Sequence, residues 1–162
     1  MNLALTQEVT EIVNLILQQL ETDNAKYSPD NKEINVLVIG PQHSGKSSFI
    51  NLFFKYFNPS WKVAVCDVGR KAQVGTVYYD KVKVGARNQK TFHFFDVAGK
   101  PFEQGLHPND MNQLSKLLQG LPTYTNLIKE DAWMSSEVAP ENKVDAVVCV
   151  VSAELLTKVV IQ

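Results

Sequence analysis

The chain has 162 residues, with 16 lysines and arginines against 17 aspartates and glutamates, and a formal net charge of −1. Hydrophobic residues make up 44% and charged residues 20%, an ordinary globular composition that excludes collagen-like, coiled-coil and disordered classes. The near-neutral net charge argues against a protein whose main function is to bind nucleic acid or an anionic membrane. Cys66 and Cys149 are too few for a disulfide framework. A cytoplasmic location is expected, since no secretory signal, lipidation pattern or membrane-spanning run is evident.

Residues 1–22 predict an amphipathic helix with Thr6 near its N-cap. Its apolar residues recur at helical spacing and form one stripe: Leu5, Val9, Ile12, Val13, Ile16, Leu17 and Leu20. This stripe is expected to dock on the rest of the chain, and the alternative is self-association or binding of another protein. Residues 23–33 (DNAKYSPDNKE) are polar, contain Pro29 and are predicted to be a linker.

From residue 34 to residue 162, strand-like and helix-like segments alternate. The patterns predict a buried strand at 34–39, a helix at 46–57, a hairpin of 76–84 and 91–95 with its turn at 85–89, a helix at 109–119 and a buried strand at 145–151. The expected fold class is α/β: a mostly parallel sheet of the P-loop type with one antiparallel hairpin, flanked by helices.

The most specific signal is Gly40-Pro-Gln-His-Ser-Gly45-Lys46-Ser47, which matches the phosphate-binding pattern G-x-x-x-x-G-K-[ST]. Its glycines allow a tight turn whose N–H groups meet phosphate oxygens, and the following helix directs its positive end at the same anion. Lys46 would reach the β- and γ-phosphates, and the Ser47 hydroxyl would bind Mg²⁺. The alternative is a glycine-rich turn without a ligand. The residues predicted to contact nucleotide here are Gly40, Gln42, His43, Ser44, Gly45, Lys46, Ser47 and Ser48.

A second motif, Asp96-Val-Ala-Gly99, follows the second hairpin strand. A carboxylate at that position can hold Mg²⁺ through water, and the Gly99 amide can approach a γ-phosphate. Thr76 stands where a switch threonine would close onto Mg²⁺. The predicted metal site therefore combines Ser47, Thr76 and Asp96. The alternatives are an ordinary turn after the strand and a β-prone threonine that begins one.

The order of strand, phosphate loop, helix, threonine-bearing loop, hairpin and D-x-x-G resembles the GTPase class of P-loop proteins. In detail the chain is similar to the interferon-induced protein forty-four family. The similar stretches are VLVIGPQHSGKSSFIN (36–51), FHFFDVAG (92–99), GLHPNDMNQLSKLLQG (105–120) and VDAVVCVVSAELL (144–156). The resemblance implies a cytoplasmic protein that binds GTP or GDP with Mg²⁺ and is linked to antiviral or immune responses.

GTPases read guanine through an N/T-K-x-D motif, and this chain contains Asn142-Lys143-Val144-Asp145. An apolar strand follows these residues rather than preceding them, which places Asp145 at a strand's beginning. Ligand-binding loops lie at the carboxyl ends of parallel strands, so we expect that this motif does not read the base. A base-reading motif and the last strands of the sheet would then lie beyond residue 162.

The expected hydrolysis is slow or partner-stimulated, because Lys100 and Pro101 stand where many GTPases place a water-orienting glutamine. The candidate catalytic residues are Gln42, His43 and Thr76. Two other functions stay open at this point. One is an ATP-binding P-loop protein, since no base-reading motif is secure. The other is a non-catalytic interaction module that keeps a remnant of the loop.

Basic residues gather on the predicted hairpin, at Lys81, Lys83, Arg87 and Lys90. Charge on an edge strand protects it from pairing with other chains, and an acidic partner is the alternative reading. The two tryptophans, Trp61 and Trp133, lie in loop-like stretches and are either partner anchors or core residues.

Overall fold

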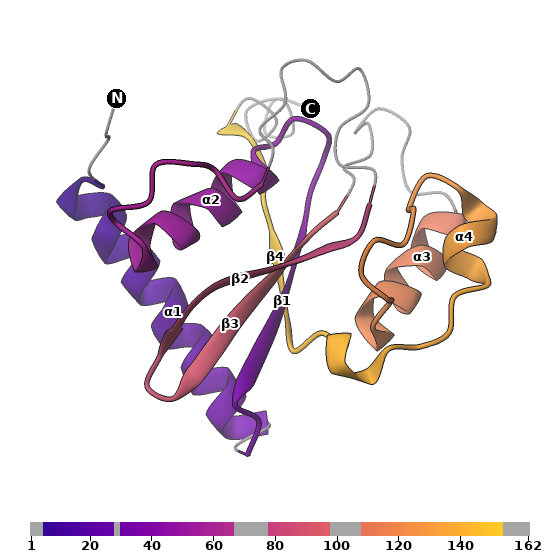
Figure 1. The fold of residues 1–162 in the computed structure, drawn as a ribbon, viewed down its shortest axis with the longest axis horizontal. Coiled ribbons are helices and arrows are strands. Elements are labelled where there is room, and N and C mark those ends of the chain that lie inside the picture. The colour runs from indigo at the N-terminus through magenta and orange to yellow at the C-terminus, as the bar shows by residue number, and fades with distance from the viewer. Residues whose placement is uncertain (1–4, 28–29, 67–77, 98–107, 154–162) are drawn as a thin grey trace, which may run out of the picture.

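The computed structural model describes residues 5–27, 30–66, 78–97 and 108–153, which build a four-stranded sheet with helices on both faces (Figure 1). The strand order is β2-β3-β1-β4. The central strand β1 is parallel to β3 and to β4, whereas β2 and β3 form the antiparallel hairpin. The strands are β1 (Glu33–Ile39), β2 (Asp80–Arg87), β3 (Lys90–Asp96) and β4 (Ala146–Cys149). The α/β class with one hairpin is therefore confirmed.

Two pairs of helices cover the sheet. Helices α1 (Gln7–Tyr27) and α2 (Lys46–Phe57) lie on one face, and α3 (Pro108–Gln119) and α4 (Glu130–Met134) lie on the other (Figure 1). A short 3-10 helix, Pro140–Asn142, precedes β4. Within the described ranges, no helix has both the length and the apolar character needed to cross a membrane.

The middle strand is apolar on both sides because both of its faces are covered. Ile34, Val36 and Val38 of β1 pack in the core under α1 and α2, while Leu37 packs in the core under α3 and α4. On the first face they meet Phe92 and Phe94 of β3 and Ile50 and Phe53 of α2. This double burial fixes the register of β1, so the position at which the chain leaves the sheet is fixed as well.

The N-terminal helix docks on the rest of the chain, which confirms the first of the two possibilities drawn from its apolar stripe. Val13, Leu17 and Leu20 are buried against the α2 side of the sheet, whereas Ile12 is 54% exposed. The Thr6 hydroxyl caps the helix by accepting a hydrogen bond from Val9 N at 3.3 Å.

The boundary between helix and linker differs from the sequence prediction. Residues 23–27 belong to α1 rather than to a linker, and Glu33 already belongs to β1. The extra turn is supported by the Gln19 amide, which donates to both carboxylate oxygens of Asp23 one turn later. It also buries Asn24. Only residues between Tyr27 and Glu33 remain as the connection.

The hairpin forms, but its turn lies later than residues 85–89 suggested. Asn88 and Gln89 both have positive φ, 50° and 64°, which is the two-residue turn that matches strand twist. Gly85 lies inside β2 beside a bulge. A Cβ atom on Gly85 would stand 2.1 Å from Cγ of Phe57, so packing against this ring is what requires glycine there.

Candidate phosphate-binding site

The segment from Gly40 to Gly45 is a tight loop between the carboxyl end of β1 and the first residue of α2. Gly40, His43 and Gly45 have φ values of 149°, 60° and 98°, so half of the loop has left-handed backbone. A Cβ atom on Gly40 would stand 2.1 Å from Val150 O, whereas no atom of the described residues lies within 4 Å of a Cβ on Gly45. The loop is therefore pressed against the end of β4 at Gly40 and is open at Gly45.

Helix α2 begins at this loop without a side-chain cap. Gly45 is its N-cap residue and, as a glycine, supplies no side chain to accept a hydrogen bond at this end. The first N–H groups of any helix lack partners within the helix, and here they belong to Lys46, Ser47 and Ser48. The start of α2 therefore has the positive end of a helix dipole beside an open loop.

The Lys46 side chain is folded back over the loop. Its Nζ donates to the carbonyl oxygen of Pro41 at 2.9 Å, and the residue is only 7% exposed. Burial lowers the pKa of the Lys46 ammonium, and the nearby Asp96 carboxylate offsets part of this effect. A cation held in this way gains from any anion that enters the loop.

Ser47 and Asp96 meet at the end of the sheet. Asp96 is the last residue of β3, opposite Val38 of the parallel neighbour β1, and is 4% exposed. The Ser47 hydroxyl donates to Asp96 Oδ2 at 2.7 Å. The pattern predicted that these residues lie together, and the structure brings them together.

The oxygen donors of this pair fit Mg²⁺, which prefers carboxylates, hydroxyls, phosphates and water. In the described part of the chain, no group of three or more His, Cys, Asp and Glu residues could hold a metal ion by itself. A Mg²⁺ ion at Ser47 and Asp96 would therefore need phosphate oxygens and water to complete its coordination. That is the usual arrangement for this ion.

Asp80 is a carboxylate at the same place that the sequence reasoning missed. It lies directly opposite Asp96 across the β2–β3 pair, and like charges in that position destabilise a sheet. Burial raises the pKa of the Cys66 thiol to about 12, and the Asp96 and Asp80 carboxylates add to this effect. The signal that could have found Asp80 is the hairpin register, which follows only once the turn is placed at Asn88 and Gln89.

Ser44 adds an unsatisfied polar group. Its Oγ is buried, lies near Gly40 and has no hydrogen-bond partner among the residues that the structure describes. A buried hydroxyl without a partner costs about 1–3 kcal/mol, so a loop that keeps one needs a reason such as a ligand. Of the other predicted loop residues, Gln42 is partly exposed and His43 is exposed. Thr76 and Gly99 lie outside the described residues, as do Lys100 and Pro101.

The Asn142–Asp145 motif lies at the other end of the sheet. Asp145 Oδ2 accepts a hydrogen bond from Asn35 N at 2.8 Å, and Asp145 N donates to Asn35 O at 2.8 Å. The Asn142 amide is buried and donates to Leu121 O. About 16 Å of extended chain separates Asn35, which holds Asp145, from Gly40, where the loop begins. Asp145 directly precedes β4, as expected, and its side chain has a structural partner. The strand itself is shorter than the predicted 145–151 and is not buried, since Val147 and Cys149 are exposed.

No protein-family model, curated protein or solved structure matches the chain.

Proposed function

We propose that the chain binds GTP or GDP with Mg²⁺ through the loop from Gly40 to Ser47. The observation that carries this proposal is the buried Lys46 ammonium, held over a loop whose following helix has no side-chain cap. A cation, free helix amides and left-handed backbone are the components of a polyphosphate site. They gather at the carboxyl end of β1, where ligands of parallel sheets bind.

Each side chain has a role that its place allows. The Lys46 ammonium exchanges the Pro41 carbonyl for β- and γ-phosphate oxygens, and the Ser44 hydroxyl gains a phosphate partner. Ser47 and Asp96 hold Mg²⁺, directly and through water. When bound, this ion neutralises phosphate charge. Thr76 and Gly99 complete the site in this proposal, as metal ligand and γ-phosphate contact.

The choice of guanine rests on the resemblance to GTPases and to the interferon-induced protein forty-four family. The same resemblance supports a cytoplasmic location and a part in immune responses. Asp145 does not support guanine, since it is bonded to Asn35 at the far end of β1. ATP is therefore the ligand to be tested against GTP. Gln42 and His43 are the candidates for stabilising charge during hydrolysis, which we propose to be slow.

A nucleotide titration tests the proposal. Fluorescently labelled GTP, GDP and ATP are titrated, with and without Mg²⁺, into the wild type, Lys46→Ala and Lys129→Ala, an exposed control on the α4 side. We expect Mg²⁺-dependent GTP binding that weakens about 100-fold in Lys46→Ala, because a charge-assisted contact to phosphate is lost, and that is unchanged in Lys129→Ala. Circular dichroism checks that each variant is folded.

Two results would count against the proposal. Equal affinity for ATP and GTP, lost in Lys46→Ala, would retain the phosphate site and remove the choice of guanine. A folded wild type that binds no nucleotide at millimolar concentration would remove the nucleotide function altogether. The chain would then keep the loop only as part of its fold.

A further inference from the structure

Strand β2 forms one edge of the described sheet, and part of its backbone faces away from β3. Backbone groups alternate along a strand, and Tyr79 just before β2 points outward, since it bonds to the segment 124–125. Lys81 and Lys83 therefore also direct their N–H and C=O groups outward. Among the residues that the structure describes, no further hydrogen bond reaches these outward groups. These backbone groups are therefore placed to pair with another strand.

The open stretch has a defined beginning and end. At one end, Tyr79 N donates to Thr125 O at 2.9 Å and Tyr124 N donates to Tyr79 O at 2.6 Å. At the other end, the Asn58 side-chain amide donates to Val84 O at 3.2 Å. The residues between them, Asp80–Lys83, span about 13 Å. This length suits four residues of an added strand, which would continue the line that residues 124–126 begin.

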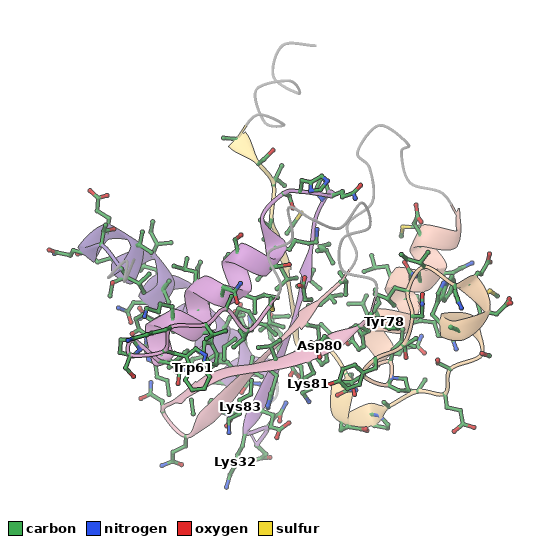
Figure 2. The ribbon with its side chains drawn as sticks, turned by 45° about the horizontal axis from the view of Figure 1, so that its top comes forward. Lys32, Trp61, Tyr78, Asp80, Lys81 and Lys83 are labelled. Atoms are coloured by element: carbon green, nitrogen blue, oxygen red, sulfur yellow. The ribbon has the colours of Figure 1, made fainter. Side chains whose placement is uncertain are left out.

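One face of this edge carries positive charge. Lys81 and Lys83 alternate with the core residues Val82 and Val84, so both lysines stand on the α3–α4 side of the sheet. Lys83 is exposed, and no hydrogen bond or ion pair engages its side chain among the described residues. Figure 2 shows the two lysines following one another along β2, with Lys32 beyond them.

The acidic residue on this face is already engaged. Glu33 lies 3.8 Å from Lys81 Nζ and 3.8 Å from His93 Nδ1. It therefore compensates Lys81, whose Nζ also donates to Glu141 O at 3.1 Å. Among the described residues, no ion pair engages Lys83 or Lys32. Asp80 points to the opposite, α2 side, since its position alternates with that of Lys81.

Two exposed aromatic residues lie near the ends of this edge. Tyr78, which precedes β2 and forms an isolated bridge with Asn126, is 52% exposed. Trp61 is 53% exposed, packs edge-on against Phe54, and follows Asn58, which bonds to Val84. Figure 2 shows Tyr78 and Trp61 toward opposite ends of β2. The edge therefore has positive charge on its α3–α4 side and the exposed Trp61 ring on its α2 side.

We propose that the edge of β2 from Asp80 to Lys83 docks an extended acidic segment of another protein, whose carboxylates alternate with apolar side chains. The segment adds to the sheet as a strand, its carboxylates lie along the face of Lys81 and Lys83, where Lys83 is the lysine that no described residue engages, and its apolar side chains lie on the side of Trp61. The same lysines repel a second copy of this edge, so protection from self-pairing and selection of an acidic partner have one cause.

A short peptide tests the proposal directly. The probe is (Glu-Val)₃-amide with fluorescein on its N-terminal nitrogen, and its controls are the (Lys-Val)₃ peptide and a block peptide with three Glu followed by three Val, both labelled in the same way. Fluorescence anisotropy at low salt is measured with the wild type, Lys83→Glu, Lys83→Pro and Lys26→Glu. Lys26 is an exposed lysine on α1, on the other face of the sheet. Thermal melts show which variants are folded.

We expect saturable binding of the alternating acidic peptide with a Kd on the order of 100 μM, as suits a short docking strand. Affinity should fall about tenfold in Lys83→Glu and with added salt, because the contact is electrostatic. It should be lost in Lys83→Pro, which removes an outward N–H, and stay unchanged in Lys26→Glu. The (Lys-Val)₃ peptide should bind Lys83→Glu better than the wild type.

Three results would overturn the proposal. The first is the absence of binding to the folded wild type at millimolar peptide. The second is equal weakening in Lys83→Glu and Lys26→Glu, which would indicate attraction by overall charge. The third is undiminished binding in folded Lys83→Pro or equal binding of the block peptide, since either would exclude strand addition.

Discussion

The two ends of the sheet each place an aspartate beside β1, and the two aspartates differ in what they hold. At the amino end, Asp145 accepts a hydrogen bond from the backbone of β1 and joins β1 to β4. At the carboxyl end, Asp96 accepts a hydrogen bond from the Ser47 hydroxyl, a side-chain group. The first bond belongs to the pairing of strands. The second could be exchanged for a ligand without opening the sheet.

This difference shows why sequence motifs need a position in the fold. Both aspartates belong to patterns typical of GTPases, D-x-x-G and N-K-x-D. Only Asp96 lies at the end where the loop, Lys46 and the start of α2 meet. A motif match thus gains weight from the end of the strand at which it lies.

The largest effect is expected at the carboxyl end, from Gly40→Ala. A Cβ atom there would meet Val150 O at 2.1 Å and would force φ out of 149°. We expect a loss of about 3 kcal/mol or more in the free energy of unfolding, measured by urea denaturation. The matched control is Gly45→Ala, where the added methyl enters open space and only backbone strain of about 1 kcal/mol remains. Equal losses in the two variants would contradict the close approach to β4.

The next largest effect is expected at the amino end of the sheet, from removing the Asp145 carboxylate. Asp145→Ala removes the acceptor for Asn35 N, and we expect a loss of about 1–3 kcal/mol in stability, measured in urea. Asp145→Asn keeps an oxygen acceptor and should cost less. Neither variant should change the preference between GTP and ATP. A change of preference in folded Asp145→Asn would show that this residue contacts the base.

A smaller effect concerns a second unsatisfied hydroxyl near the carboxyl end. Tyr79 is fully buried and its ring stacks on Phe95 at 4.7 Å, and within the described ranges its OH has no hydrogen-bond partner. Tyr79→Phe keeps the stacked ring and removes the unsatisfied group, so we expect stability to rise by about 1 kcal/mol in urea denaturation. A loss of similar size would mean that the hydroxyl is satisfied in solution.

The smallest effect lies at the amino end, at His93. Burial lowers the pKa of His93, as do Lys81 and Lys83, while Glu33 acts in the opposite direction. The unfolded chain then binds a proton below about pH 6.5 that the folded chain resists, so stability should fall as the pH drops from about 7 to 5. This slope should be smaller in His93→Gln, measured by urea denaturation across that range. An unchanged slope would show that His93 is not its source.

The sequence predicted those parts of the fold that depend on neighbouring residues. The uncharged run of β1, the amphipathic pattern of α2 and the cap at Thr6 were each confirmed. What it missed depends on distant contacts. Gly85 looked like a turn residue because the Phe57 ring that it contacts belongs to another element. The five-residue helix α4 is held by burial of Trp133 in the core under α3, which no local pattern reveals.

The candidate site shows the same division between residues that local sequence predicts and residues that distant contacts place. Lys46, Ser47 and Asp96 follow from spacing, because the turn, the helix start and the strand end are fixed by local geometry. Asp80 was missed, since its place opposite Asp96 depends on the register of the hairpin. The Pro41 carbonyl that receives Lys46 was missed as well, because any residue could supply a backbone oxygen.

The two thiols differ enough to give the protein a selective attachment point for probes. Cys66 is buried, and its pKa of about 12 keeps it protonated and unreactive at neutral pH, whereas Cys149 on β4 is exposed. A maleimide dye or a nitroxide should therefore modify Cys149 alone, without any engineered cysteine. Spectroscopic measurements on the native chain would then report from the strand whose end touches the Gly40 loop.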